Sequence, residues 1–302
     1  MGLSILKGCE FLRYASERWS ILVFLLPASV LYLLFVIYPS FNAFLMSLYN
    51  WRGLGTKTFI GLDNYKRMLE DEIFINTLKV TGKYILIQVP IVLLLSVVIA
   101  LSISHFLKTR WLNLYRSITF FPYILPGVAI AMLWSTILNP VNGMFNGLLD
   151  AVGLDFLMTE WLGRTETAFG SVVFVNVWGM VGFYSILILA AILNIPQDIL
   201  EAAEIDGATK FKKSIYITLP MLRDILQVVT IFTLINTIKI FEMPQLLTGG
   251  GPNRSTQPIS LYIYEQAFSN FNFGYASALG VIFLILTLIA SMLTLKVTRR
   301  EG

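Results

Sequence analysis

The chain has 302 residues, of which 56% are apolar and 13% charged, and its formal net charge is +4. Soluble globular proteins carry about 25% charged residues, so this composition excludes a soluble domain. One cysteine and one histidine exclude a structural zinc site, an iron–sulfur cluster and an internal disulfide, and we expect neither a metal nor another cofactor. No basic stripe interleaves with aromatic residues, so the excess of base indicates a membrane rather than nucleic acid.

Long stretches without Asp, Glu, Lys or Arg define the candidate membrane spans. A helix needs about 20 apolar residues to cross about 30 Å of hydrocarbon. Five stretches reach this length, and a sixth does so when charged residues at its ends extend to the membrane interfaces. The predicted spans cover residues 20–48, 84–107, 117–138, 169–193, 219–242 and 273–295. We therefore predict an all-α integral membrane fold with six transmembrane helices.

The distribution of basic residues predicts the orientation of these spans. An even number of spans places both termini on one side, and cytoplasmic segments collect Lys and Arg. Bases cluster before the first span, between the second and third, and after the sixth: Lys7, Arg13, Arg18, Lys108, Arg110, Arg116, Lys296, Arg299 and Arg300. We expect cytoplasmic tails at 1–19 and 297–302, flanking a membrane domain at 20–296. The connection 50–79 contains several bases against this trend, and we place it outside because longer loops obey the rule less strictly.

Prolines interrupt the first three predicted spans. Each removes a backbone donor and favours a kink that neighbouring helices must accommodate. These residues are Pro27, Pro39, Pro90, Pro122 and Pro126. Kinked helices are typical of a cavity or a moving part, although proline is also generally more frequent in membrane helices than in soluble ones.

The segment 194–220, between the fourth and fifth spans, is far more polar than its surroundings. Its local chemistry predicts helix, turn, helix, in which Asn194 caps the first helix and Pro196 occupies its first turn. Gly207 is expected to end that helix in a left-handed conformation that a side chain would resist. A second short helix is predicted over Ala208–Tyr216. The segment is either a solvated hairpin or a docking surface for another protein.

A resemblance to a known family favours docking. The segment matches the pattern Glu-Ala-Ala, three residues, Gly, nine residues, Ile, one residue, Leu-Pro, and is similar to the EAA loop of ABC importer permeases. The matching residues are Glu201, Ala202, Ala203, Gly207, Ile217, Leu219 and Pro220. A chance match is on the order of one in a million. The resemblance implies that these residues and Asp206 couple the chain to a separate ATPase, and that the fold is that of a type I ABC importer permease with a cytoplasmic coupling-helix loop.

Further motifs resemble the carbohydrate-uptake branch of this family, in particular the first permease subunit of maltose-type or glycerol-phosphate-type importers. The motifs are Gly61-Leu62-Asp63-Asn64-Tyr65, Asn139-Pro140 with Gly143 and Asn146, Ile205-Asp206-Gly207-Ala208, and Leu247-Thr248-Gly249-Gly250-Gly251-Pro252. Together the resemblance covers nearly the whole chain from Trp19 onward. It leaves open which sugar or sugar phosphate is carried.

The resemblance also implies a function and a set of partners. The chain would be a permease subunit that moves a sugar-like solute inward by alternating access in the bacterial cytoplasmic membrane. Its partners would be a second, homologous permease, two ATPase subunits and an extracytoplasmic solute-binding protein, although a homodimer stays open. No segment carries a Walker motif, and the run Gly249–Pro252 lacks the Gly-Lys-Ser/Thr ending of a phosphate-binding loop. We therefore expect no catalytic site, with ATP hydrolysed by the partner.

Polar and aromatic residues inside the fourth and fifth spans are candidates for the solute pathway. An unpaired polar group is costly in hydrocarbon, and aromatic faces suit the C–H surfaces of sugars. The candidates are Asn176, Trp178, Tyr184, Asn236 and Thr237. The alternative is ordinary interhelical hydrogen bonding or an interfacial aromatic belt. Lys239 and Glu242 lie three residues apart on one predicted helix face and are candidates for pairing with each other.

Two other classes of protein provide alternatives. An ion-coupled secondary transporter would usually show acidic residues inside its spans, and the sequence shows none away from their ends. A membrane-embedded enzyme would need a nucleophile, a base or a metal set. The single histidine, His105, is predicted at the cytoplasmic end of the second span, where an interfacial role is expected.

Overall fold

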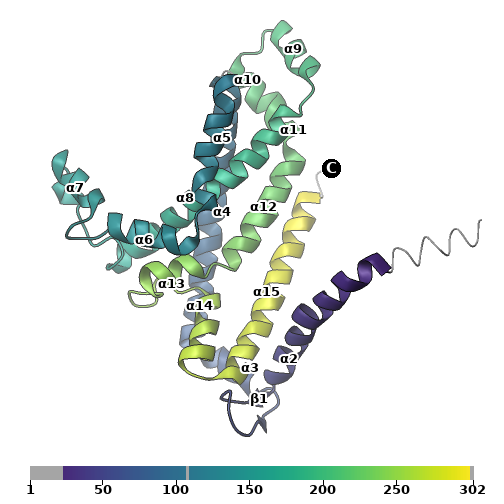
Figure 1. The fold of residues 1–302 in the computed structure, drawn as a ribbon, viewed down its shortest axis with the longest axis vertical. Coiled ribbons are helices and arrows are strands. Elements are labelled where there is room, and N and C mark those ends of the chain that lie inside the picture. Colours follow the sequence, from purple (N-terminus) through teal and green to yellow (C-terminus); the bar gives the residue numbers. More distant parts are fainter. Residues whose placement is uncertain (1–22, 107–108, 300–302) are drawn as a thin grey trace, which may run out of the picture. The chain divides into compact units, whose positions relative to one another are not determined.

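The computed structural model describes residues 23–106 and 109–299, which are built mainly of helices (Figure 1). The first helical segment is Val23–Met46, in which α2 is Tyr38–Met46. The other helices are α3 Asp63–Glu70, α4 Glu72–Phe106, α5 Thr109–Ile124, α6 Gly127–Ile137, α7 Met144–Ala151, α8 Thr165–Leu193, α9 Gln197–Ile205, α10 Lys210–Lys213, α11 Leu219–Met221, α12 Arg223–Ile238, α13 Glu242–Thr248, α14 Ile259–Tyr264 and α15 Phe273–Arg299. Within the described ranges, the strands are β1 Tyr49–Asn50 and β2 Thr58–Phe59.

Tighter and wider helical turns occur between these elements. A 3-10 turn covers Asp155–Leu157, and π-helical turns cover Leu33–Ile37, Ser214–Thr218 and Glu265–Ser269. The predicted N-terminal tail 1–19, with its bases Lys7, Arg13 and Arg18, lies outside the described residues. The bases Lys108 and Arg300 and the side chain of His105 lie outside them too.

Four helices in the described part of the chain are long and apolar enough to cross a membrane. They are Val23–Met46, Glu72–Ser104, Thr165–Leu193 and Phe273–Lys296. Two bent pairs of helices pass the same test when each pair counts as one span, which raises the number to six. These pairs are Asn113–Ile124 with Gly127–Ile137, and Lys210–Met221 with Arg223–Ile238.

The third apolar stretch is not the continuous helix expected over 117–138. Its two halves meet at an angle of 93°. Pro126 caps α6 with φ −57° and ψ 137°, outside the helical region. Proline has no backbone N–H and disfavours a helical conformation at the preceding Leu125, so the helix cannot continue. Pro122, by contrast, stays within α5.

The fifth stretch also differs from the helix expected over 219–242. α12 ends at Ile238, with Lys239 as its C-cap, and a new helix begins at Glu242. The expected pairing of Lys239 with Glu242 is wrong, because the two residues do not share a helix face and no ion pair between them occurs in the part of the chain that the structure describes. Packing of α13 against α6 accompanies this break, which a local apolar pattern cannot anticipate.

The chain forms two compact units. Among the described residues, the first contains Val23–Arg67 together with Gln266–Val281. In it, β1 pairs antiparallel with β2, with Tyr49 opposite Phe59. The Asn64 amide of the Gly61–Tyr65 motif donates to the carbonyls of Ser47, at 2.7 Å, and Tyr49, at 3.1 Å. This motif therefore fixes the polypeptide around the ribbon.

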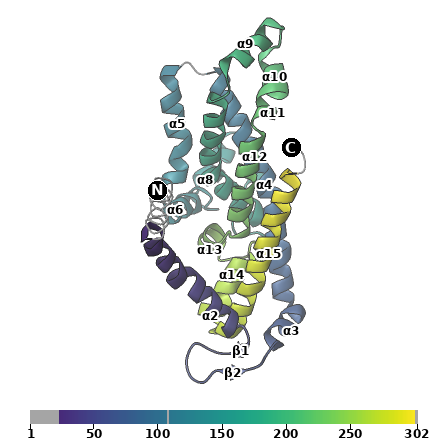
Figure 2. The same cartoon turned by 90° about the vertical axis from the view of Figure 1, so that its right-hand side faces the viewer.

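The second unit contains Met68–Glu265 and the chain from Ile282 onward. Its helices α4, α8 and α12 run side by side in both views (Figures 1 and 2). Apolar side chains from these helices form its core, including the fully buried Val92, Ile188 and Val229. α5 approaches α8 closely at Gly182, where an added Cβ would overlap the carbonyl of Thr119.

Candidate functional site: a polar pocket and a polar hairpin

Three helices contribute to a buried hydrogen-bonded chain of polar side chains. The Asn176 amide on α8 donates to Oε1 of Gln88 on α4 at 2.9 Å, and the Gln88 amide donates to the hydroxyl of Thr237 on α12 at 3.0 Å. The side chains of Gln88 and Thr237 are fully buried. In a hydrocarbon environment polar groups need hydrogen-bond partners within the protein, and here the three side chains provide them for one another. We call these three residues the Gln88 cluster.

A second polar pair lies between α8 and α12. The Asn236 amide donates to the hydroxyl of Tyr184 at 3.0 Å, and Tyr184 is buried. The structure thus places Asn176, Tyr184, Asn236 and Thr237 in hydrogen bonds between helices. Trp178 does not join them, because its indole packs edge-on against that of Trp134, with ring centroids 5.5 Å apart.

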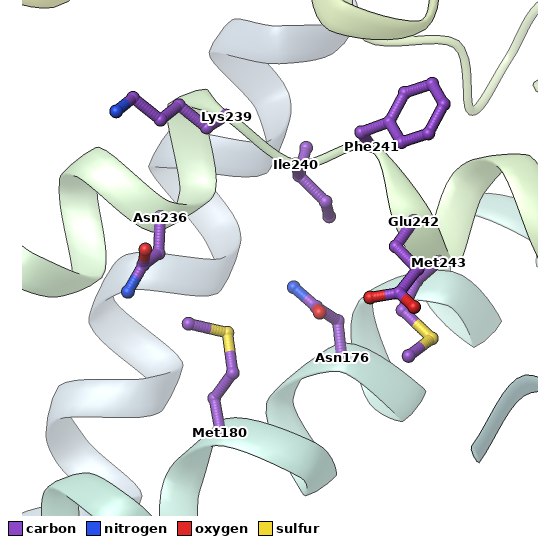
Figure 3. Close-up of a pocket in the computed structure, with 8 residues that line it drawn as sticks. All are labelled: Asn176, Met180, Asn236, Lys239, Ile240, Phe241, Glu242 and Met243. Carbon is purple, nitrogen blue, oxygen red and sulfur yellow. The ribbon is translucent and has the colours of Figure 1, made fainter. Parts of the chain in front are cut away.

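A pocket of about 260 Å³ adjoins these hydrogen bonds (Figure 3). It is lined by Asn176, Met180, Asn236, Lys239, Ile240, Phe241, Glu242 and Met243. In Figure 3, Asn176, Met180 and Glu242 point toward the space between α8, α12 and α13, whereas the Lys239 side chain extends away from Glu242. The pocket thus combines amide groups, which donate and accept hydrogen bonds, with one carboxylate.

Sequence reasoning missed two residues of this site. Gln88 is an amide in the middle of a long apolar stretch, and that isolation was the available signal. The sequence predicts that Glu242 ends the fifth span at the membrane interface. In the structure its carboxylate instead lies against Gly127, where an added Cβ would overlap it. Gly127 begins α6 and Glu242 lies in the first turn of α13, so one carboxylate adjoins the positive ends of two helices. No basic side chain in the described part of the chain pairs with Glu242, and this arrangement helps to accommodate its charge.

The hairpin formed by residues 194–220 contains the turn that the sequence predicted. Gly207 has φ +79°, in the left-handed region. Its N–H donates to the carbonyl of Glu204 at 3.0 Å, and the N–H of Ala208 donates to the carbonyl of Ala203 at 2.9 Å. This pair of bonds is the Schellman motif, which ends a helix at a left-handed residue. The prediction for Gly207 is therefore confirmed.

Two details of the hairpin differ from prediction. Pro196, not Asn194, caps α9, and Asn194 is instead the C-cap of α8, where its amide donates to the Ala190 carbonyl at 3.0 Å. The second helix is also shorter than the predicted Ala208–Tyr216. α10 stops at Lys213, after which the chain widens into a π-helical turn that leads into α11.

An ion pair joins the two arms of the hairpin. The buried Lys213 ammonium donates to the Glu204 carboxylate, and this hydrogen bond with its charge lowers the pKa of Glu204. Glu201 remains exposed on α9, and only Gln197 donates to its carboxylate among the contacts that the structure describes, at 2.8 Å. Ile205 is 87% exposed, so the hairpin also presents apolar surface that a partner protein could cover.

A third polar group lies in the loop between α13 and α15. The Arg254 guanidinium donates two hydrogen bonds to the Glu265 carboxylate, at 2.7 and 2.8 Å, and the Gln257 amide donates to the same group. The hydrogen bond from Arg254 is the main cause that lowers the pKa of Glu265. The Arg254 carbonyl also accepts from Asn76 on α4, at 3.3 Å. These contacts tie the loop to the start of α4.

Acidification is expected to loosen this loop. The folded-state pKa of Glu265 is lowered, so the ion pair stabilises the loop above the unfolded pKa of about 4.3 and this contribution is lost as the pH falls through the folded pKa. Because the Arg254–Glu265 pair is partly exposed, we expect it to contribute about 1 kcal/mol to the stability of the loop.

Amide hydrogen exchange over residues 249–265, corrected for intrinsic rates, measures this effect. Glu265→Gln should exchange faster than wild type near neutral pH and change little on acidification, while the wild type approaches it. Asp150→Asn, which alters an exposed carboxylate in α7, is the control. Equal protection of Glu265→Gln and wild type at neutral pH would contradict the prediction.

The chain is similar to known transport proteins along most of its length. The family model described as "Binding-protein-dependent transport system inner membrane component" matches residues 92–301. The chain is 37% identical over 292 residues to the diacetylchitobiose uptake system permease protein NgcF of Streptomyces coelicolor, covering 93% of this chain and 82% of that protein. It is 34% identical over 289 residues to the trehalose/maltose transport system permease protein MalF of Thermococcus litoralis, covering 95% and 96% of the two chains.

A solved structure shows the same fold. It is a chain of a bacterial alginate ABC transporter in complex with an alginate pentasaccharide-bound periplasmic protein. The TM-score is 0.82 and the sequence identity 26%, over 96% of this chain and 97% of that chain. The EAA-type hairpin and the polar pocket therefore occur in a chain whose whole length matches an importer subunit.

Proposed function

Because the chain belongs to the family of inner membrane components of binding-protein-dependent transport systems, as an ABC importer permease of the type I fold, we propose that its solute is a sugar or sugar-like molecule. Family membership makes it a multi-pass inner membrane protein and a transport subunit. The ion-coupled secondary transporter considered from the sequence does not hold, because the matching proteins are ABC transporter subunits.

The observation that carries the solute class is the polar pocket between α8, α12 and α13. Asn176 and Asn236 present amides that both donate and accept, which suits the hydroxyls of a neutral sugar. Relatives named for diacetylchitobiose and for trehalose and maltose support this class. Asn176, Tyr184, Asn236 and Thr237 are therefore proposed to belong to the solute pathway, with Gln88 positioning Asn176 and Thr237. Trp178 is proposed only as packing for the wall formed by α8.

The hairpin at 194–220 is proposed to receive the force that drives transport. Glu201, Ala202 and Asp206 are exposed on or just after α9, where an ATPase subunit would make contact. Ala203 packs inward at the base of the same helix, and Gly207 sets the turn. Ile217, Leu219 and Pro220 connect this contact to α12, so a rigid-body movement of the hairpin is passed to a helix that lines the pocket.

The remaining partners follow from the same proposal. A second, homologous permease completes the pathway, two ATPase subunits hydrolyse ATP, and a solute-binding protein delivers the sugar. The described chain is proposed to lie with the hairpin and its C-terminal end in the cytoplasm, and the loop between α13 and α15 outside. No catalytic role is assigned to its own residues.

Affinity purification combined with uptake measurements tests this proposal. Purification of the tagged chain in mild detergent should recover an ATPase and a second permease, and vesicles containing this complex and its binding protein should take up labelled maltose or diacetylchitobiose only with ATP inside. Recovery of the chain alone, or uptake driven by an ion gradient without ATP, would contradict the proposal.

Pocket variants test the pathway within the same assay. Asn176→Ala removes an amide from the pocket and a hydrogen bond worth about 1 kcal/mol, so we expect uptake to fall about fivefold to tenfold with the complex intact. Asn142→Ala, which alters an exposed amide between α6 and α7, is the matched control and should keep full uptake. Equal uptake by both variants would exclude Asn176 from the pathway.

A further inference from the structure

A groove separate from the polar pocket lies between the end of α4 and the start of the second arm of the hairpin. Its volume is about 320 Å³. Its lining residues are Val98, Leu101 and Ser102 from α4, Lys210 and Phe211 from α10, and Ser214 and Ile215 from the π-helical turn. Neither the solute pathway nor the contact surface proposed for α9 uses these residues. We call this feature the α4–α10 groove.

The chemistry of the groove is strongly asymmetric. Its walls are largely apolar, and Lys210 is the only charged residue among those that line it. The hydroxyl of Ser214 donates to the Lys210 carbonyl at 3.0 Å, so this serine is already engaged by the backbone. A ligand that fits must therefore offer an apolar portion for the walls and a negative charge for the ammonium group of Lys210.

Of the three lysines near the groove, Lys210 is the one placed to bind a negatively charged ligand group. Lys213 is buried and paired with Glu204, so its charge is already used within the hairpin. Lys212 is exposed but does not line the groove. Among the described residues that line the groove none is acidic, and Glu204, whose charge Lys210 also feels, is already hydrogen-bonded to Lys213.

The groove also leaves apolar surface uncovered. Phe211 is 74% exposed and Val98 49% exposed. Such exposure is unfavourable in water but ordinary against lipid chains, because each buried methylene group gains about 0.8 kcal/mol. The groove lies at the end of α4 that precedes the basic connection near Arg110 and Arg116, which the proposed topology places at the cytoplasmic membrane surface.

We propose that the α4–α10 groove binds one anionic phospholipid of the cytoplasmic leaflet. One acyl chain lies against Val98, Leu101, Phe211 and Ile215, and the headgroup phosphate pairs with Lys210. Basic pockets between membrane helices on the cytoplasmic side are known to hold anionic headgroups. Because the groove joins a membrane helix to the hairpin, a bound lipid steadies the hairpin at the angle from which it contacts the ATPase. The inference rests on the cytoplasmic position proposed for the hairpin.

Lipid retention by the purified complex tests this inference. The full-length chain with its co-purifying subunits is placed in nanodiscs of phosphatidylcholine with and without phosphatidylglycerol, and bound lipid is measured by native mass spectrometry after release. Wild type should retain one phosphatidylglycerol in preference to phosphatidylcholine. Lys210→Gln should weaken that retention about fivefold, the factor that corresponds to about 1 kcal/mol for one basic residue near the membrane surface. Lys212→Gln is the matched control and should retain phosphatidylglycerol as wild type does.

A second variant separates loss of the site from misfolding. Val98→Trp fills the apolar part of the groove and keeps Lys210, so it should release the lipid while the complex still assembles. Equal weakening by Lys210→Gln and Lys212→Gln, or undiminished retention by Val98→Trp, would overturn the inference. So would a crosslink from Phe211 to the ATPase, which would show that protein covers the groove. Failure of the proposed function would instead appear as absent uptake, which lipid retention does not measure.

Discussion

Replacing Gly207 by valine is expected to separate the chain from its ATPase and to lower ATP-driven uptake more than tenfold. Gly207 has φ +79°, a conformation that costs a residue with a side chain about 1–2 kcal/mol and a β-branched residue more. Apart from its two chain neighbours, no atom of the described residues lies within 4 Å of a Cβ built at this position, so the variant acts through the backbone alone. The turn would relax toward negative φ, and the Schellman bonds that end α9 would break. Co-purification of the ATPase and uptake in vesicles measure the result.

Two control variants show whether this effect comes from the conformation of the hairpin. Gly207→Asn should retain most of the activity, because asparagine visits the left-handed region more readily than other residues with side chains. Gly153→Val introduces the same kind of strain at φ +75° in the loop after α7, where the surroundings are also open, and should leave ATPase association unchanged. Full ATPase association by Gly207→Val would show that the hairpin does not depend on this turn.

Replacing Gly127 by alanine is expected to reduce uptake strongly while the ATPase stays bound. An added Cβ would overlap the carboxylate of Glu242, which is the end of a flexible side chain, so this carboxylate must leave its place between α6 and α13 beside the polar pocket. Moving the carboxylate away from the first turns of α6 and α13 costs about 0.3–2 kcal/mol for each helix end. Uptake at saturating sugar, together with ATPase recovery during purification, distinguishes this local effect from loss of the complex. We expect uptake to fall at least tenfold.

A compensating change makes this prediction specific. Glu242→Asp shortens the side chain, so the double variant Gly127→Ala with Glu242→Asp should recover a large part of the uptake lost by Gly127→Ala. Gly170→Ala is the control, because a Cβ on this glycine of α8 meets no atom within 4 Å. If the double variant is no better than Gly127→Ala, contact with the carboxylate is not the cause. Glu242→Gln, which keeps the shape and removes the charge, then reports whether the charge matters for the solute.

The sequence by itself determined the features that depend only on residues close to one another in the chain. Five stretches free of charge and a sixth with charges at its ends predicted apolar helices, because hydrocarbon accepts few charged side chains, and each of the six contains helix. The turn at Gly207 was predictable because a left-handed residue and two backbone bonds within six residues define it. The EAA pattern also lies within one short segment, so it could be recognised from the sequence and pointed to the family. Asn176 and Asn236 stood out as amides in apolar helices.

Only the tertiary structure decided which distant groups meet. The prolines of the third span predicted a kink but not its size. The structure shows a bend of 93° between α5 and α6, and α13 packs against α6 beyond that bend. Gln88 belongs to the polar cluster because its side chain on α4 bonds both Asn176 on α8 and Thr237 on α12, whereas the indole of Trp178 packs against that of Trp134. The sequence predicts an interfacial position for Glu242, whereas the fold places its carboxylate against Gly127, more than a hundred residues earlier in the chain. Contacts at such separations depend on how helices pack, and packing is a property of the assembled bundle rather than of any one segment.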